Sequence, residues 1–167
     1  SLDEVFVIGG SLIMGLALPL TALQIIWVNL FTGSLPALAF AFDENMDRRK
    51  YFKKESKRIF TKEVKVLTLG IGVLSSLFLF LLYYVLTKTV ADIAEARSIF
   101  FVCFASYILA ISFSFRSLYN PLFSYSVLSN KKLNLSIVLA LAILILTMTI
   151  PFMRDIFKLA PLPMYSL

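Results

Sequence analysis

The sequence predicts an all-α membrane protein, a polytopic bundle of about five transmembrane helices. Hydrophobic residues make up 59% of its 167 residues and charged residues 16%, against about 45–50% and 25% in soluble domains. The charges are also segregated, since residues 5–42, 66–87, 98–115 and 133–153 contain none. A bilayer core is crossed by about 20 apolar residues. The first run is therefore long enough for two spans and each later run for one.

Two helices fit inside the first run, at about residues 4–18 and 21–42. Pro19 separates them, because proline lacks an amide hydrogen and its ring clashes with the preceding helical turn. Pro36 removes the helical partner of the Thr32 carbonyl in the same way, and Gly33 lets the backbone loosen there. We therefore expect the second helix to be unwound near Gly33–Pro36.

Three further helices follow the later apolar runs. Thr61 is suited to cap the first of them, and Glu63 lies in its first turn, where the helix dipole favours an acid. The last one is expected to stop near Pro151, which cannot continue a helix. The expected helices lie at about residues 64–87, 97–117 and 133–152, within one transmembrane domain fragment that spans residues 1–167.

The charged segment between the second and third helices predicts the orientation in the membrane. Residues 43–65 hold nine basic and five acidic side chains. Lys and Arg gather in cytoplasmic loops of membrane proteins, so we expect a cytoplasmic loop at 43–63. A nucleic-acid-binding patch is the alternative, but the segment has neither aromatic stacking platforms nor a folded basic domain. We therefore expect no nucleic-acid partner.

Several classes of enzyme are excluded by composition. The chain has no His, so a Ser-His-Asp triad and a His-rich metal site are both ruled out, and Cys103 has no second cysteine to pair with. A glycine-rich phosphate loop is also missing from the sequence. We expect no catalytic residue in this chain. Because the first apolar arm before Pro19 is short and residues 159–167 turn apolar again, we expect a piece of a larger protein.

A polar cluster stands out inside the second helix. Asn29, Thr32 and Gly33 are spaced i, i+3 and i+4, so they share one helical face. Together with a carbonyl freed by Pro36 they offer neutral oxygen donors, which bind hard cations, normally with at least one carboxylate. Glu4, at the start of the first helix, is the candidate carboxylate. The alternatives are that Asn29 and Thr32 only hydrogen-bond between helices, and that Glu4 only marks the end of a span.

Residues 18–42 resemble the sixth transmembrane helix of P-type cation-transporting ATPases. Glu4 also precedes Asn29 by 25 residues, the separation between the fifth-helix glutamate and the sixth-helix asparagine in calcium pumps. The resemblance covers nearly the whole chain, as helices five to nine of such a pump. The positions that match the family pattern are Gln24, Trp27, Val28, Asn29, Thr32, Leu35, Pro36 and Ala37.

The resemblance implies cation ligands at Glu4, Asn29 and Thr32. Ser1 falls where many members have an asparagine ligand, and Gly33 falls where the family has its central aspartate. A glycine supplies no side-chain oxygen, so this departure weakens a calcium site. Asp3 does not replace the lost acid, because neighbouring residues point about 100° apart on a helix. We expect monovalent or proton-coupled transport, or weak divalent binding.

The resemblance also implies a parent protein that is an ATP-driven cation pump, with an aspartyl-phosphate intermediate and with Mg²⁺ and ATP as cofactors. Its upstream membrane helices and its phosphorylation, nucleotide and actuator domains would be partners of this segment, beside the lipid bilayer and the transported cation. We expect a multi-pass protein of the plasma membrane that supplies part of the cation site and of the translocation pathway. The alternatives are a degenerate, non-transporting scaffold and a free-standing channel or secondary transporter.

Overall fold

The computed structural model describes residues 2–35, 38, 62–115 and 131–161. Every regular element among them is a helix, which confirms the predicted all-α class. The elements are α1 (Leu2–Ile13), α2 (Ala22–Trp27), the π-helix η1 (Val28–Ser34), α5 (Lys62–Thr89), α6 (Ile93–Phe115), α7 (Lys131–Thr149) and α8 (Pro151–Phe157).

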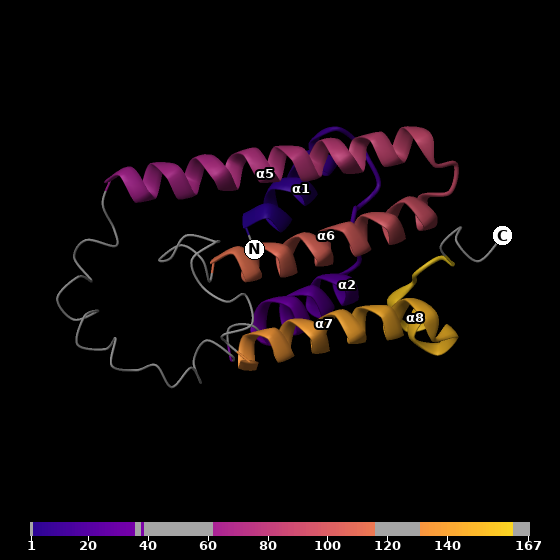
Figure 1. Cartoon of the computed structure of the whole chain (residues 1–167). Coiled ribbons are helices and arrows are strands. Elements are labelled where there is room, and N and C mark those ends of the chain that lie inside the picture. The colour runs from indigo at the N-terminus through magenta and orange to yellow at the C-terminus, as the bar shows by residue number, and fades with distance from the viewer. Residues whose placement is uncertain (1, 36–37, 39–61, 116–130, 162–167) are drawn as a thin grey trace.

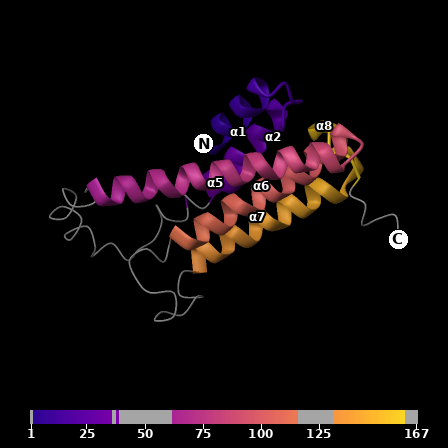
Figure 2. The same ribbon diagram turned by 90° about the horizontal axis from the view of Figure 1, so that it is seen from above.

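The three long helices α5, α6 and α7 lie side by side, with α6 between the other two (Figures 1 and 2). The short helix α1 packs along α5, and η1 contacts both α6 and α7. Later residues of the N-terminal segment contact later residues of α5: Asp3 contacts Ser76, and Ala17, which follows α1, contacts Tyr83. α1 and α5 therefore run parallel, and the two N-terminal helices cover one side of the long-helix layer.

Two helices are long and apolar enough to cross a membrane unaided, over Leu69–Thr89 and Ile93–Ser112. Asn134–Thr149 and Pro151–Phe157 pass the same test together, although they are bent by 92°. The helical segment Ala22–Ser34 is apolar but shorter. The described residues thus hold two or three of the five predicted spans. Of the predicted loop 43–63, residues 43–61 lie outside the described part, whereas Lys62 and Glu63 already belong to α5.

The first helix ends at Ile13, not at 18 as predicted. Gly15 adopts a left-handed conformation, with φ of 67°. Its N–H bonds to the Leu12 carbonyl at 3.1 Å, and the Leu16 N–H bonds to the Ser11 carbonyl at 2.8 Å. This pair of bonds around a left-handed glycine is the Schellman motif, which ends helices. The glycine overrides the apolar run that extends beyond it.

The link between α5 and α6 is shorter than the gap of 88–96 between the predicted helices. α5 continues to Thr89 and α6 begins at Ile93. Asp92 caps the new helix, because its carboxylate accepts the Ala94 N–H at 3.1 Å, and Glu95 lies in the first turn. Acids at these positions stabilise a helix start. Asp92 and Glu95, which lie between two charge-free runs, therefore mark the beginning of a helix.

The predicted helix 133–152 is two helices. α7 ends at Thr149, Ile150 is extended, and Pro151 opens α8, where a proline is well tolerated because the first helical N–H groups need no partner. Lys158 then ends α8 in a left-handed conformation, with φ of 52°. The proline was expected to stop a helix, and it also starts the next one.

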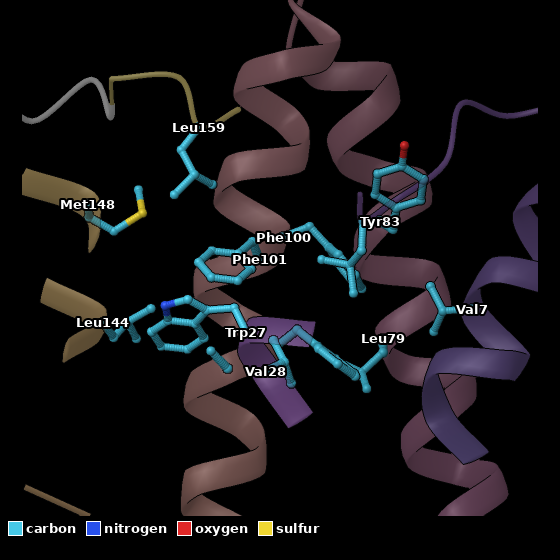
Figure 3. Packing of buried hydrophobic residues seen from close by; sticks show 13 residues of the cluster. Val7, Trp27, Val28, Leu79, Tyr83, Phe100, Phe101, Leu144, Met148 and Leu159 are labelled. Atoms are coloured by element: carbon cyan, nitrogen blue, oxygen red, sulfur yellow. The ribbon is translucent and has the colours of Figure 1, made fainter. Parts of the chain in front are cut away.

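An aromatic core joins these helices (Figure 3). Trp27 is 1% exposed and lies edge-on to Phe101 of α6, with ring centroids 5.2 Å apart. Phe31 of η1 contacts the same indole at 5.2 Å, and Leu144 and Met148 of α7 belong to the same cluster. The core therefore fixes the α2–η1 helix against α6 and α7.

Candidate functional site

The start of α2 is held by a capping box. The Thr21 hydroxyl accepts the Gln24 N–H at 3.3 Å, and the Gln24 side-chain oxygen accepts the Thr21 N–H at 2.9 Å. The Gln24 amide nitrogen then donates to the Phe157 carbonyl of α8 at 3.0 Å. The fully buried side chain of Gln24 thus caps its own helix and also joins it to α8, the last helix of the sequence.

Trp27 gives the helix a second tether. Its indole N–H donates to the Thr147 hydroxyl of α7 at 3.0 Å, and that hydroxyl donates to the Ile143 carbonyl at 2.7 Å. Both partners are buried, and a buried polar group that loses its partner costs about 1–3 kcal/mol. The helix that carries the polar cluster is therefore rigidly placed.

The polar cluster lies in the π-helix η1, whose hydrogen bonds run from i to i+5. The Ser34 hydroxyl also donates to the Asn29 carbonyl five residues earlier, at 3.1 Å. The departure from α-helical geometry predicted near Gly33 thus takes the form of a widened helix that begins at Val28. Leu35 remains helical, and Pro36 lies outside the described residues. Such π segments occur frequently at functional sites.

Glu4 and Asn29 are in direct contact. The Asn29 side-chain nitrogen donates to a Glu4 carboxylate oxygen at 3.0 Å and to the Ile25 carbonyl at 3.0 Å. The Glu4 side chain is buried, whereas Asn29 is exposed. Two residues predicted to act together, 25 positions apart, therefore meet across α1 and η1.

Thr32 and Gly33 are placed differently from that pair. Thr32 is fully buried, and its hydroxyl donates to the Val28 carbonyl of its own helix at 2.6 Å. Gly33 is exposed, and no atom lies within 4 Å of where its Cβ would be. Space therefore exists for a side chain at Gly33. Ser1, the remaining predicted position, lies outside the described residues.

Asp3 is directed away from Glu4, as the sequence predicted. Its carboxylate accepts a hydrogen bond from the buried Ser76 hydroxyl on α5. The two consecutive acids of α1 thus accept hydrogen bonds from different helices, Asp3 from α5 and Glu4 from η1.

Sequence reasoning missed the tethers of Gln24 and Trp27. The Thr21-x-x-Gln24 spacing is a recognisable capping-box signal, so the cap could have been found from sequence. The bonds to Phe157 and Thr147 could not, because their partners lie 133 and 120 residues away.

The sequence is similar to those of known cation-transporting ATPases. Residues 17–167 match the family model described as "Cation transporting ATPase, C-terminus". The chain is 32% identical to the Calcium-transporting ATPase of Bacillus subtilis (strain 168) over 118 residues, which is 66% of the chain and 12% of that protein.

Two further relatives are matched over almost the whole chain. Identity is 27% to Calcium-transporting ATPase 1 of Bacillus cereus (strain ATCC 10987 / NRS 248), covering 92% of the chain and 19% of that protein. Identity is 28% to Calcium-transporting ATPase 1 of Lactococcus lactis subsp. lactis (strain IL1403), covering 95% and 18%. No solved structure gave a significant match.

The chain thus spans 12% to 19% of the length of these relatives. The family match covers far more than half of the chain, and its apolar helices are long enough to cross a bilayer. The chain therefore belongs to the family of C-terminal membrane domains of cation-transporting P-type ATPases.

Proposed function

We propose that this domain supplies part of the cation site and of the translocation pathway in an ATP-driven pump. The observation that carries the proposal is the 3.0 Å hydrogen bond between the Asn29 amide and the Glu4 carboxylate. It joins a buried acid on α1 to a polar side chain on a π segment.

The contact can exchange one partner for another. A buried carboxylate in a membrane is costly, and the Asn29 N–H offsets part of that cost for Glu4. An amide carries a donor nitrogen and an acceptor oxygen. If the Asn29 side chain turns over, its oxygen faces the Glu4 carboxylate, and a cation between the two satisfies both.

Thr32 can supply a neutral oxygen to the site, whereas Gly33 cannot supply a side-chain ligand. The Thr32 hydroxyl donates to Val28, so its oxygen lone pairs are free to accept, whereas Gly33 supplies no side-chain oxygen. One carboxylate at Glu4 with neutral oxygens favours a monovalent cation or a bound proton, because divalent affinity falls with the number of charged ligands. We therefore propose monovalent or proton-coupled transport, with weak divalent binding.

The pump itself needs domains that precede this segment in the family. We propose that upstream membrane helices and the phosphorylation, nucleotide and actuator domains complete it, with Mg²⁺ and ATP as its cofactors and the plasma membrane as its location. The relatives' names as calcium-transporting ATPases support a pump. Their calcium does not transfer directly, because of Gly33.

The proposal is tested in the full-length protein by ion-stimulated ATPase activity. Glu4→Gln keeps the shape of the side chain and removes its charge, so stimulation by Na⁺, K⁺ or acid pH should be lost. Asn29→Ala should weaken it at least tenfold. Asp155→Asn is the matched control, since Asp155 is exposed on α8, and it should behave as wild type.

Tight calcium binding that Glu4→Gln leaves unchanged would contradict the proposed site. The Gly33 departure also favours a second function, a membrane scaffold that moves no ions. A scaffold would show no ion-stimulated ATPase activity in the wild-type protein, and its upstream sequence would lack the phosphorylated aspartate. Ion flux by the protein in liposomes without ATP would instead support a channel.

A further inference from the structure

A second polar cluster lies between α1, α5 and α6, away from Glu4. The Asp3 carboxylate accepts a hydrogen bond from Ser76 of α5. On α6, the Tyr107 hydroxyl is shielded from solvent and has no well-formed hydrogen bond among the described residues. Asp3 and the Ser75 hydroxyl are polar groups close enough to act on it. The Asp3 carboxylate of α1 thus has a direct hydroxyl partner on α5, Ser76, and a second, shielded hydroxyl nearby on α6, Tyr107.

The cluster lies at membrane depth. Ser76 comes seven residues after Leu69, where the apolar span of α5 begins, and a helix rises about 1.5 Å per residue. Asp3 therefore meets α5 about 10 Å inside that span. No ion pair joins Asp3 to a basic side chain in the described part of the chain, although an uncompensated carboxylate is costly at this depth.

The serine hydroxyls can turn their oxygens toward Asp3. The Ser76 oxygen lies within hydrogen-bond distance of both Asp3 and the Gly72 carbonyl, the latter at 2.8 Å. Since a hydroxyl has only one proton, it donates to one of them at a time. When it donates to Gly72, its lone pairs are free to face Asp3. Ser75 already donates to the same carbonyl at 3.0 Å.

We propose that Asp3, Ser76 and Tyr107 form a second cation site for a small monovalent ion such as Na⁺. The ion takes the place of the Ser76 proton beside Asp3, and the Ser76 hydroxyl turns to Gly72. One carboxylate and neutral hydroxyl oxygens suit a single positive charge, whereas divalent ions rely on several carboxylates. This site needs only a bound ion, so it does not depend on the transport proposed at Glu4.

The test is ²²Na⁺ binding to the purified full-length protein in detergent, with choline chloride holding the ionic strength constant. Asp3→Asn should remove one bound Na⁺ per molecule, and Ser76→Ala and Tyr107→Phe should each weaken that ion at least tenfold. Ser112→Ala is the matched control, because the Ser112 hydroxyl also donates within its own helix, to Ile108. It should bind Na⁺ as wild type does.

Glu4→Gln separates the two proposals. If the site at Asp3 exists, Glu4→Gln leaves its Na⁺ in place whatever happens to ATPase activity. Unchanged Na⁺ binding in both Asp3→Asn and Ser76→Ala would overturn the second site, as would a wild-type protein that binds no Na⁺. Loss of the same single ion in Asp3→Asn and in Glu4→Gln would also overturn it, because it would show one shared site.

Discussion

The two ends of the N-terminal helix pair are held in different ways. Beyond α1, the chain is anchored through its backbone: Tyr83 donates to the Ala17 carbonyl at 2.7 Å, and the Arg97 Nε donates to the Leu18 carbonyl at 2.8 Å. At the start of α1 the bonds join side chains instead, Glu4 to Asn29 and Asp3 to Ser76.

The difference separates fixed contacts from exchangeable ones. A backbone carbonyl cannot turn away without moving the chain, so the anchors at Ala17 and Leu18 hold the connection between α1 and α2 in place. Amide and hydroxyl side chains rotate and can accept where they once donated. An ion could therefore enter beside Glu4 or Asp3 while the anchored end stays unchanged.

Trp27 offers the strongest way to break the fixed framework. Trp27→Ala should lower the free energy of unfolding by about 3–5 kcal/mol, because it removes a buried aromatic side chain and leaves a cavity. Thermal unfolding in detergent measures the loss. Thr147→Val keeps nearly the same volume and removes the hydroxyl that accepts the indole N–H and donates to Ile143, so it should cost about 1–3 kcal/mol. Equal losses in the two variants would contradict the packing role.

Gly33→Asp tests the exchangeable side-chain contacts near Glu4. The added carboxylate has open space four residues after Asn29, the hydrogen-bond partner of Glu4, so divalent binding should tighten. We expect at least a tenfold rise in apparent affinity for Ca²⁺, measured by Ca²⁺-stimulated ATPase activity of the full-length protein. Gly33→Asn is the control, because it adds an oxygen without charge. An equal gain in both variants would show that charge is not what the site lacks.

The sequence predicted the class of fold and the meeting of Glu4 with Asn29. Long apolar runs determine spans through a simple length rule, and the family pattern aligned the two residues. The sequence predicted that a helix stops near Pro151, but not that α1 ends before Gly15 or that α6 begins after Asp92. Local hydrogen bonds and backbone geometry set those two ends, and the charge-free runs do not report them.

The other hydrogen-bond partners of the side chains were also not predicted from the sequence. Nothing in the sequence pattern indicated that Asp3 faces Ser76. That pairing depends on the parallel packing of α1 and α5, which is a tertiary feature. The π-helix likewise begins at Val28, before the glycine and proline from which a distortion was expected.

Tyr83→Phe tests one backbone anchor alone. It removes the hydroxyl that donates to Ala17 and keeps the buried ring, so the free energy of unfolding should fall by about 0.5–1.5 kcal/mol. Tyr84→Phe is the matched control, because that neighbouring hydroxyl makes none of the described hydrogen bonds and should change stability little. Na⁺ binding should survive in both variants. Loss of Na⁺ binding in Tyr83→Phe would show that the two ends of α1 are coupled.

The adjacent glycines of α1 provide the smallest test, which separates the face of α1 that contacts α5 from the one that does not. A glycine inside a helix is less stable than alanine by about 0.5–1 kcal/mol. At Gly9 a new Cβ meets nothing within 4 Å, whereas at Gly10 it lies 3.0 Å from two ring atoms of Phe80.

Gly9→Ala should therefore raise the free energy of unfolding by about 0.5–1 kcal/mol, measured by thermal unfolding in detergent. Gly10→Ala should gain less or lose stability, because the Phe80 ring must shift, and combining it with Phe80→Leu should restore part of the difference. If Gly10→Ala stabilised the protein as much as Gly9→Ala, then α1 and α5 would not pack as closely as the structure indicates.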